Sequence, residues 1–221
     1  MAAGRPVQVY LDLLSQPCRA VYILLTCTKI PHKVHAVAEV GFRFGKRLKG
    51  GYLTRLFTCC SDAILKYLAT QYDVPEHWYP RQPQQRARVD EYTAWHHTNT
   101  RAHAAKVFIL EVLLPRHMGS AVDKVALNNA LSNLKNTLDK LETMFLRRQP
   151  FLCGDDITVA DLLAICELMQ VRSVKRAGTG LFLSMLSVLS AASRSRAGHL
   201  EGPPTAAALE EPRPISCWQV I

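Results

Sequence analysis

Residues 10–23 read YLDLLSQPCRAVYI, and this stretch decides how the chain begins to fold. The run over residues 7–14 alternates between apolar and polar side chains and then becomes continuously apolar, which is typical of a buried strand. Pro17 suits the first turn of a helix, because the N–H that proline lacks has no partner there. A helix is therefore predicted from Pro17 to about Thr28, and the polar Ser15 lies where the strand gives way to it.

A second short strand is predicted at KVHAV, residues 33–37. The order strand, helix, strand is a βαβ unit, in which the two strands run parallel. The following residues 38–58 contain four glycines and fit neither the helical nor the strand period, so they are left as an irregular region.

The chain has 221 residues, of which 48% are hydrophobic and 20% charged, as in soluble globular proteins. No basic region leads into an apolar N-terminal stretch, and the apolar run 181–189 is too short and too rich in serine to cross a bilayer. The seven cysteines include no CxxC pair. We expect a cytoplasmic protein, or a nuclear one, with reduced thiols and with neither a membrane partner nor a bound metal.

The formal charge of +9 raises the question of nucleic-acid binding. However, residues 81–170 carry 11 basic and 10 acidic side chains, so the best-patterned part of the chain is nearly neutral. A basic cluster between Arg43 and Arg55 is interpreted as a solvated loop, since no nucleic-acid reading motif accompanies it. No nucleic-acid partner is expected.

Helical patterns return at SDAILKYLATQYDV, for which Ser61 is a reasonable N-cap. Three prolines then fall within nine residues and indicate a linker over residues 79–85. We predict a first domain over 1–78, a helical domain over 86–170, and a poorly ordered, divergent tail over 171–221.

The helical domain contains a long amphipathic helix with leucines spaced by three and four residues, and Pro150 is expected to stop it. Further on, Thr158 and Asp161 have the spacing of a capping box at the start of an apolar helix. We interpret this pair as an element of folding rather than of chemistry.

The serine at the mouth of the first helix is the strongest candidate for chemistry. A hydroxyl there lies close to helix N–H groups and to the positive end of the helix dipole, which favours an anion. Unlike a cysteine, a serine cannot take part in thiol–disulfide redox chemistry. It can, however, donate a hydrogen bond to the thiolate of another molecule and so lower the pKa of that thiol. The alternative is an ordinary N-cap serine, which the spacing alone favours.

Four segments together resemble theta-class glutathione S-transferases: YLDLLSQPCRAVYI, HWYP, QQRARVDEYTAWHHT and ITVADLLAICELMQ. They occur in the order of the family, and the resemblance covers residues 7–37 and 61–170. It implies an α+β, thioredoxin-like N-terminal domain, here incomplete, followed by an all-α helical-bundle domain. It also implies a cytosolic homodimer that uses glutathione as co-substrate in detoxification.

The resemblance assigns three site residues. Ser15 matches the serine that stabilises the glutathione thiolate, and Ser61 matches the serine that binds the γ-glutamyl group at a helix N-terminus. Arg101 falls where theta enzymes place an arginine near the leaving anion, although a solvated arginine on a helix surface is an equal alternative for it.

The sequence also departs from the family pattern. No proline occurs between Pro31 and Pro75, so the expected cis-proline clamp for glutathione is missing. Cys60 replaces the glutamate that precedes the serine, and an unrelated tail follows Gln170 in place of the C-terminal lid. The expected function is therefore conjugation of glutathione to small electrophiles with impaired activity. The alternative is a non-catalytic binding or dimerisation module with the same fold.

Overall fold

The computed structural model describes residues 6–13, 15–36, 60–147 and 149–171. The calls on the irregular region 38–58, on the basic cluster within it, and on all but the first residue of the 171–221 tail lie outside these residues. The elements are, in chain order, β1 (Val7–Leu11), α1 (Gln16–Cys27), β2 (His32–Ala36), α2 (Ser61–Gln71), the 3-10 turn η1 (Glu76–Trp78), α3 (Pro83–Thr98), α4 (Thr100–Phe108), the π-helical segment η2 (Ile109–Leu113), α5 (Leu114–Met118), α6 (Lys124–Lys140), the π-helical segment η3 (Leu141–Leu146) and α7 (Val159–Leu168).

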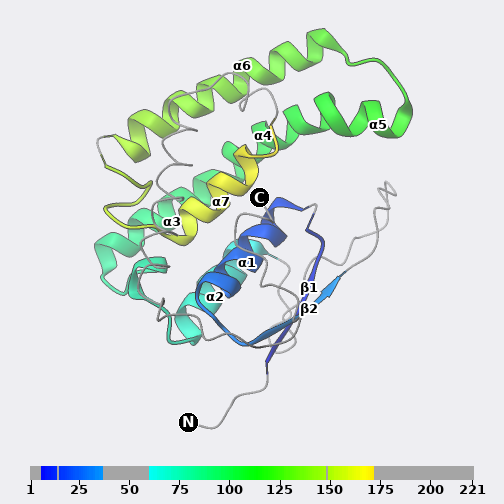
Figure 1. Cartoon of the computed structure of the whole chain (residues 1–221). Helices are drawn as coiled ribbons and strands as arrows, with labels where there is room; N and C mark the ends of the chain where they lie inside the picture. Colours follow the sequence, from blue (N-terminus) through cyan, green and yellow to red (C-terminus); the bar gives the residue numbers. More distant parts are fainter. Residues whose placement is uncertain (1–5, 14, 37–59, 148, 172–221) are drawn as a thin grey trace, which may run out of the picture.

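The chain begins with the predicted βαβ unit. Strands β1 and β2 pair in parallel, with Val7 opposite His32, and α1 connects them (Figure 1). Strand β1 ends at Leu11 rather than at residue 14, because the chain turns there: the Ser15 N–H donates to the Asp12 carbonyl at 2.9 Å. The first helix starts at Gln16, one residue earlier than predicted, with Pro17 in its first turn.

The second helix of this half is α2, and its cap differs from the prediction. The helix begins at Ser61, so the N-cap is Cys60 and not Ser61. The cysteine side chain makes no capping hydrogen bond. The N-cap position of α2 is therefore occupied by the thiol of Cys60, and Ser61, which was the predicted cap, is the first residue of the helix.

The segment between the two halves is shorter than the predicted linker 79–85. Helix α3 begins at Pro83, since proline is tolerated at the first helical position, and the Gln82 side chain caps it by accepting from the Gln85 N–H at 2.6 Å. Pro75 precedes the 3-10 turn η1, whose Trp78 is buried. Two of the three prolines thus lie at helix starts.

A bend separates α3 from α4. Asn99 has φ −118° and ψ −84°, outside the helical region, and its Nδ2 donates to the Trp95 carbonyl at 3.1 Å. Further along, the π-helical segment η2 precedes Pro115, which has no N–H to continue the helical ladder. Helix α5 ends at Gly119, whose φ of +63° suits glycine.

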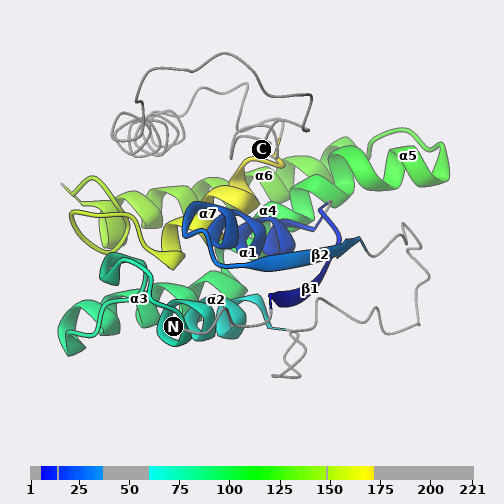
Figure 2. The same ribbon diagram turned by 60° about the horizontal axis from the view of Figure 1, so that its bottom comes forward.

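Helix α7 lies in the middle of the molecule. All ten of its residues are buried, and it packs against α1 on one side and against α3 and α4 on the other (Figures 1 and 2). The predicted capping box is confirmed: Asp161 Oδ2 accepts from the Thr158 N–H, and the Thr158 hydroxyl accepts from the Ala160 N–H. One apolar cluster joins β1, α1, α2 and the helical bundle, so the two halves share a core.

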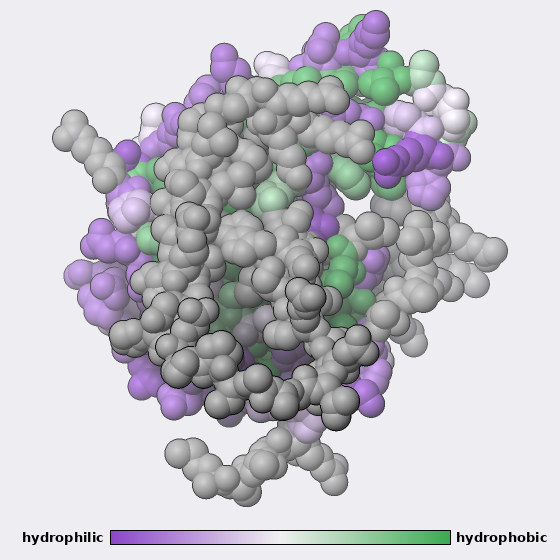
Figure 3. All heavy atoms as spheres, in the orientation of Figure 1, coloured by the Kyte–Doolittle hydropathy of each residue, from purple (hydrophilic) through white to green (hydrophobic). Residues whose placement is uncertain are grey.

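The two most exposed large hydrophobic side chains of the described residues lie at one end of the molecule. Exposed hydrophobic residues include Met118, which is 73% exposed, and Val125, which is 72% exposed. Both lie at the end of the molecule where α5 turns into α6, where green spheres show at the upper right of Figure 3. None of the helices that the structure describes is long and apolar enough to span a membrane.

Candidate functional site

Ser15 is the N-cap residue of α1, but its side chain makes no capping hydrogen bond. Its backbone is extended, with φ −78° and ψ 124°, and its carbonyl accepts the first helical hydrogen bond, from the Arg19 N–H at 3.1 Å. Its side chain is half-buried and makes no hydrogen bond to the free N–H groups of the first turn. Ser15 therefore occupies the N-cap position of the alternative interpretation, but its side chain does not make the hydrogen bond that a capping serine usually makes. The hydroxyl remains available to an external acceptor beside the positive end of the helix dipole.

The loop that carries Ser15 is held against α7. Arg19 Nη1 donates to the Leu13 carbonyl at 3.1 Å, and Arg19 Nη2 donates to the Cys166 carbonyl at 3.1 Å. One guanidinium thus ties the loop before α1 to the central helix. A second contact joins the start of α1 to the turn that follows α7: the Gln16 side-chain amide donates a hydrogen bond to the Gln170 side chain.

Ser61 is buried at the start of α2, with 6% of its surface exposed. Its Oγ has no hydrogen-bond partner in the part of the chain that the structure describes. Because a buried hydroxyl without a partner is unfavourable, this atom is the kind of group that binds a ligand oxygen. No contact between the described residues joins Ser61 to Ser15.

Arg101 lies in the first turn of α4 and faces Glu167 of α7. Its Nε is 3.8 Å from Glu167 Oε1, while its side chain is 41% exposed and that of Glu167 only 2%. Burial raises the pKa of Glu167 from 4.5 to about 7, against the opposite effect of the Arg101 and Arg19 charges. Arg101 is therefore neither a purely solvated arginine nor a buried one: it is half-exposed and faces a buried carboxyl group.

Replacing Glu167 should change how stability depends on pH. Protonated Glu167 stabilises the folded state fully below about pH 4.5, and this contribution is lost as the pH rises through 7. We therefore expect the wild-type protein to lose about 3 kcal/mol of unfolding free energy relative to Glu167→Gln as the pH is raised from 4.5 to above 7. Urea unfolding at several pH values measures the difference.

His96 also makes the stability of the protein depend on pH, in the direction opposite to Glu167, so the wild-type protein and Glu167→Gln have to be compared with each other. The buried ring of His96 has its pKa lowered to about 3, chiefly by desolvation, so it destabilises the fold as the pH falls below 6.5. That effect is common to both proteins and cancels in their difference. If the unfolding free energies of the two proteins changed in parallel with pH, Glu167 would not be a buried carboxyl group with a raised pKa.

A polar cluster with no catalytic geometry surrounds His96. The Tyr92 hydroxyl lies 3.3 Å from His96 Nδ1 and 3.3 Å from the Thr100 hydroxyl, all three residues being buried. The described residues hold no group of three or more His, Cys, Asp or Glu side chains placed to bind a metal ion. We interpret the cluster as a hydrogen-bonded part of the core.

The five cysteines in the described ranges form no disulfide with one another. Burial raises the pKa of Cys153 and of Cys166 to about 12, so both remain protonated at neutral pH. Cys18 is half-buried and packs against the core. The geometry gives Cys18, Cys153 and Cys166 the role of small apolar side chains.

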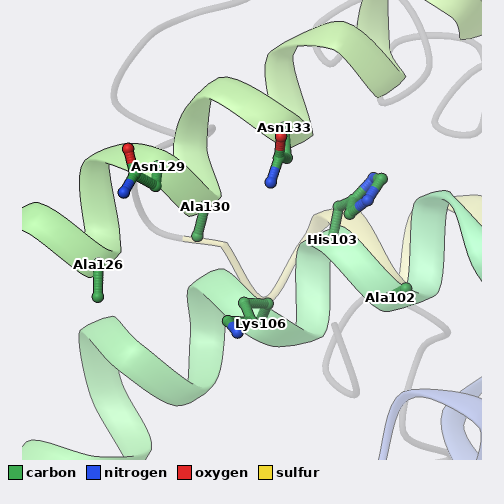
Figure 4. Close-up of a pocket in the computed structure, with 7 residues that line it drawn as sticks. All are labelled: Ala102, His103, Lys106, Ala126, Asn129, Ala130 and Asn133. Carbon is green, nitrogen blue, oxygen red and sulfur yellow. The ribbon is translucent and has the colours of Figure 1, made fainter.

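A separate cavity of about 500 Å³ lies between α4 and α6 (Figure 4). Its walls combine three alanines with polar residues, and its lining is Ala102, His103, Lys106, Ala126, Asn129, Ala130 and Asn133. None of the three predicted site residues lines it. The His103 ring is fixed by a 2.6 Å hydrogen bond between its Nδ1 and the Thr137 hydroxyl.

The sequence interpretation missed Arg19 and Glu167. Through them the N-terminal turns of α1 and α4 meet consecutive residues of α7, since Arg19 bonds to Cys166 and Arg101 faces Glu167. The signal for Glu167 was a carboxylate inside the apolar run ADLLAICELM, where a buried charge requires a partner. Arg19 gave no comparable signal, because an arginine near a helix start is common.

Comparison with known proteins agrees with this arrangement. The family model described as the glutathione S-transferase C-terminal domain matches residues 102–178. The mouse protein glutathione S-transferase theta-1 is 42% identical over 176 residues, which cover 74% of this chain and 72% of the mouse protein.

Two solved human structures have the same fold. Glutathione-S-transferase T1-1 in its apo form superposes with a TM-score of 0.75 at 36% identity, covering 84% of this chain and 83% of that one. A theta-class glutathione transferase in complex with the glutathione conjugate of 1-menaphthyl sulfate gives a TM-score of 0.67 at 28% identity, covering 86% and 91%. Fold and sequence together define a glutathione S-transferase. The chain belongs to the theta class of this family.

Proposed function

We propose that this protein is a glutathione transferase that conjugates the glutathione thiolate to small electrophiles. The observation that carries the proposal is the hydroxyl of Ser15, which lies at the N-cap position of α1 and makes no capping hydrogen bond. The relatives support it, since one of the solved theta-class structures holds a glutathione conjugate.

Ser15 would act by stabilising the thiolate. Its hydroxyl donates a hydrogen bond to the sulfur, and the N-terminus of α1 adds the favourable field of the helix dipole. Lowering a thiol pKa from about 8.5 to between 6 and 7 requires roughly 3 kcal/mol, which a charge-assisted hydrogen bond and a dipole can supply together. The thiolate then attacks the electrophilic carbon, by displacement or by addition.

Ser61 would bind glutathione, and Arg101 would stabilise the leaving group. The buried, unpartnered Ser61 hydroxyl and the N-terminus of α2 suit the γ-glutamyl carboxylate of glutathione. Arg101, whose side chain is 41% exposed, would stabilise the anion that leaves in a displacement.

We further propose that the activity is impaired. The sequence has no proline between Pro31 and Pro75 to form the cis-proline clamp, and Cys60 stands in the place of the family's glutamate. Each lost hydrogen bond to glutathione is worth on the order of 1 kcal/mol, so several of them lower the affinity by two decades or more. The divergent sequence after Gln170 also replaces the C-terminal lid.

The proposal extends to the form and place of the protein. We propose a homodimer in a reducing compartment, the cytosol, in keeping with the reduced thiols of the described cysteines, which form no disulfide with one another. The alternative function, a non-catalytic binding or dimerisation module of the same fold, follows from the same missing clamp and lid.

Turnover of a haloalkane or an arylmethyl sulfate ester by the purified full chain tests the proposal. We expect measurable glutathione-dependent conjugation at a rate well below that of mouse theta-1 measured alongside it. Retention on immobilised glutathione separates the two functions, because an enzyme binds the resin and a scaffold need not. No conjugation and no retention would favour the non-catalytic module, whereas rates equal to those of the relative would contradict the impaired activity.

A further inference from the structure

Glu167 is a charged residue in a place where an apolar one would be expected. It belongs to α7, whose ten residues are all buried, and 2% of its side chain is exposed. Moving a carboxylate out of water costs several kcal/mol even after the protein has relaxed around it. Hydrogen bonding does not offset that cost fully, because Oε2 is buried and has no hydrogen-bond partner among the described residues.

Two arginines from different helices set the environment of this carboxylate. Arg101 of α4 places its Nε 3.8 Å from Glu167 Oε1. The charge of Arg19, from α1, also favours the ionised form of Glu167. Arg19 and Arg101 differ in the other groups that their guanidinium nitrogens contact, and we infer their different roles from these contacts.

Arg19 uses both of its terminal nitrogens inside the protein, one on the Leu13 carbonyl and one on the Cys166 carbonyl. Arg101 is oriented the other way. Its inner nitrogen, Nε, faces the carboxylate, and its two Nη groups make no hydrogen bond within the part of the chain that is described. Its side chain is 41% exposed, so the guanidinium forms an ion pair with a buried carboxyl group while part of the side chain remains open to solvent.

We propose that Glu167 is a positioning residue for Arg101: it fixes the guanidinium through Nε so that the Nη groups face the leaving anion. This inference rests on the proposed function. In a displacement the thiolate sulfur forms a bond to carbon, the bond from that carbon to the leaving group breaks, and the electron pair departs with a halide or sulfate. No proton is transferred, so an oriented cation is what this step requires of the protein.

Two reactions of the same enzyme separate this role from a structural one. Glu167→Gln should lower kcat for displacement of a halide or sulfate by roughly tenfold to hundredfold, the range for a misplaced catalytic group. Addition to an organic isothiocyanate releases no anion, so its rate should stay within about twofold. The effect should be absent when Arg101 is already alanine, because the two residues then act as one unit. Glu142→Gln, at an exposed glutamate of η3, is the matched control.

A spectroscopic readout makes the inference independent of turnover. In the isotope-labelled protein the Nε–H of Arg101 should give an ordered, slowly exchanging NMR signal, assigned by its loss in Arg101→Lys. Glu167→Gln should broaden this signal or speed its exchange at least fivefold, and Glu142→Gln should leave it unchanged. Should Glu167→Gln fail to fold, Arg101→Lys supplies the kinetic test, since lysine keeps the charge but has no group to be held at the Nε position. It should show the same selective loss of displacement.

The outcomes are distinct. An ordered Arg101 signal released by Glu167→Gln, with displacement lowered and addition retained, supports the positioning role. A mobile Arg101 in the wild-type protein, or a signal indifferent to Glu167→Gln, overturns it whether or not the protein is active. Equal losses in both reactions overturn it as well. An inactive wild-type protein overturns the proposed function, and the NMR result then decides alone whether Glu167 fixes Arg101.

Discussion

Ser15→Ala should lower the rate of glutathione conjugation at neutral pH by roughly tenfold to hundredfold. The estimate follows from the loss of one hydrogen bond to a charged sulfur, worth about 1.5–3 kcal/mol. The fold should survive, because the Ser15 side chain makes no capping hydrogen bond for α1 to lose. The measurement is kcat/KM as a function of pH.

The pH profile identifies the cause of the loss. Without the hydroxyl the pKa of bound glutathione returns toward about 8.5, so raising the pH should restore part of the activity of Ser15→Ala. Ser132→Ala, at an exposed serine of α6, should behave like the wild-type protein. If Ser15→Ala were as active as the wild-type protein at every pH, the hydroxyl would have no role in the thiolate chemistry.

Asp161→Ala should have the largest effect on stability, a loss of about 3–5 kcal/mol in unfolding free energy. The Asp161 carboxylate is 2% exposed and accepts from the Leu152 N–H, the Thr158 N–H and the Thr158 hydroxyl, each at 2.9 Å. Alanine leaves two buried backbone N–H groups without partners, that of Thr158 at the start of α7 and that of Leu152 in the loop before it. Urea unfolding at pH 7 measures the loss.

Two further variants complete this experiment. Asp161→Asn keeps one carbonyl acceptor in the same shape, so it should lose less than Asp161→Ala. Asp155→Ala, at an exposed residue of the same loop, should change the unfolding free energy by no more than about 0.5 kcal/mol. A loss below 1 kcal/mol for Asp161→Ala would contradict the account of α7 as a helix held by its capping box.

The sequence predicted those parts of the fold that local pattern governs. The parallel βαβ unit follows from an apolar strand next to a proline-started helix, and the Thr158–Asp161 cap follows from residues three positions apart. The bend at Asn99 was not predictable, because neither proline nor glycine marks it. The cap of α2 was misplaced by one residue, since Cys60 and Ser61 are both compatible with that pattern.

The site was predicted only in part, for a physical reason. Ser15 and Ser61 lie at helix starts, which a sequence reveals, and the structure places them there. The contacts that surround them join distant segments: Arg19 and the Cys166 carbonyl are 147 positions apart. Such a pairing depends on how α1 packs against α7, and no periodicity in either segment encodes it. The partner of Arg101 was missed for the same reason.

Calorimetric titration of glutathione into the full chain tests the central claim most directly. The claim is that Ser15 stands beside a helix N-terminus where it holds the sulfur of glutathione in its ionised form. We predict saturable binding that releases protons at neutral pH in the wild-type protein, and binding with a smaller proton release in Ser15→Ala. Glutathione binding that is absent, or that releases the same number of protons in both proteins, would contradict it.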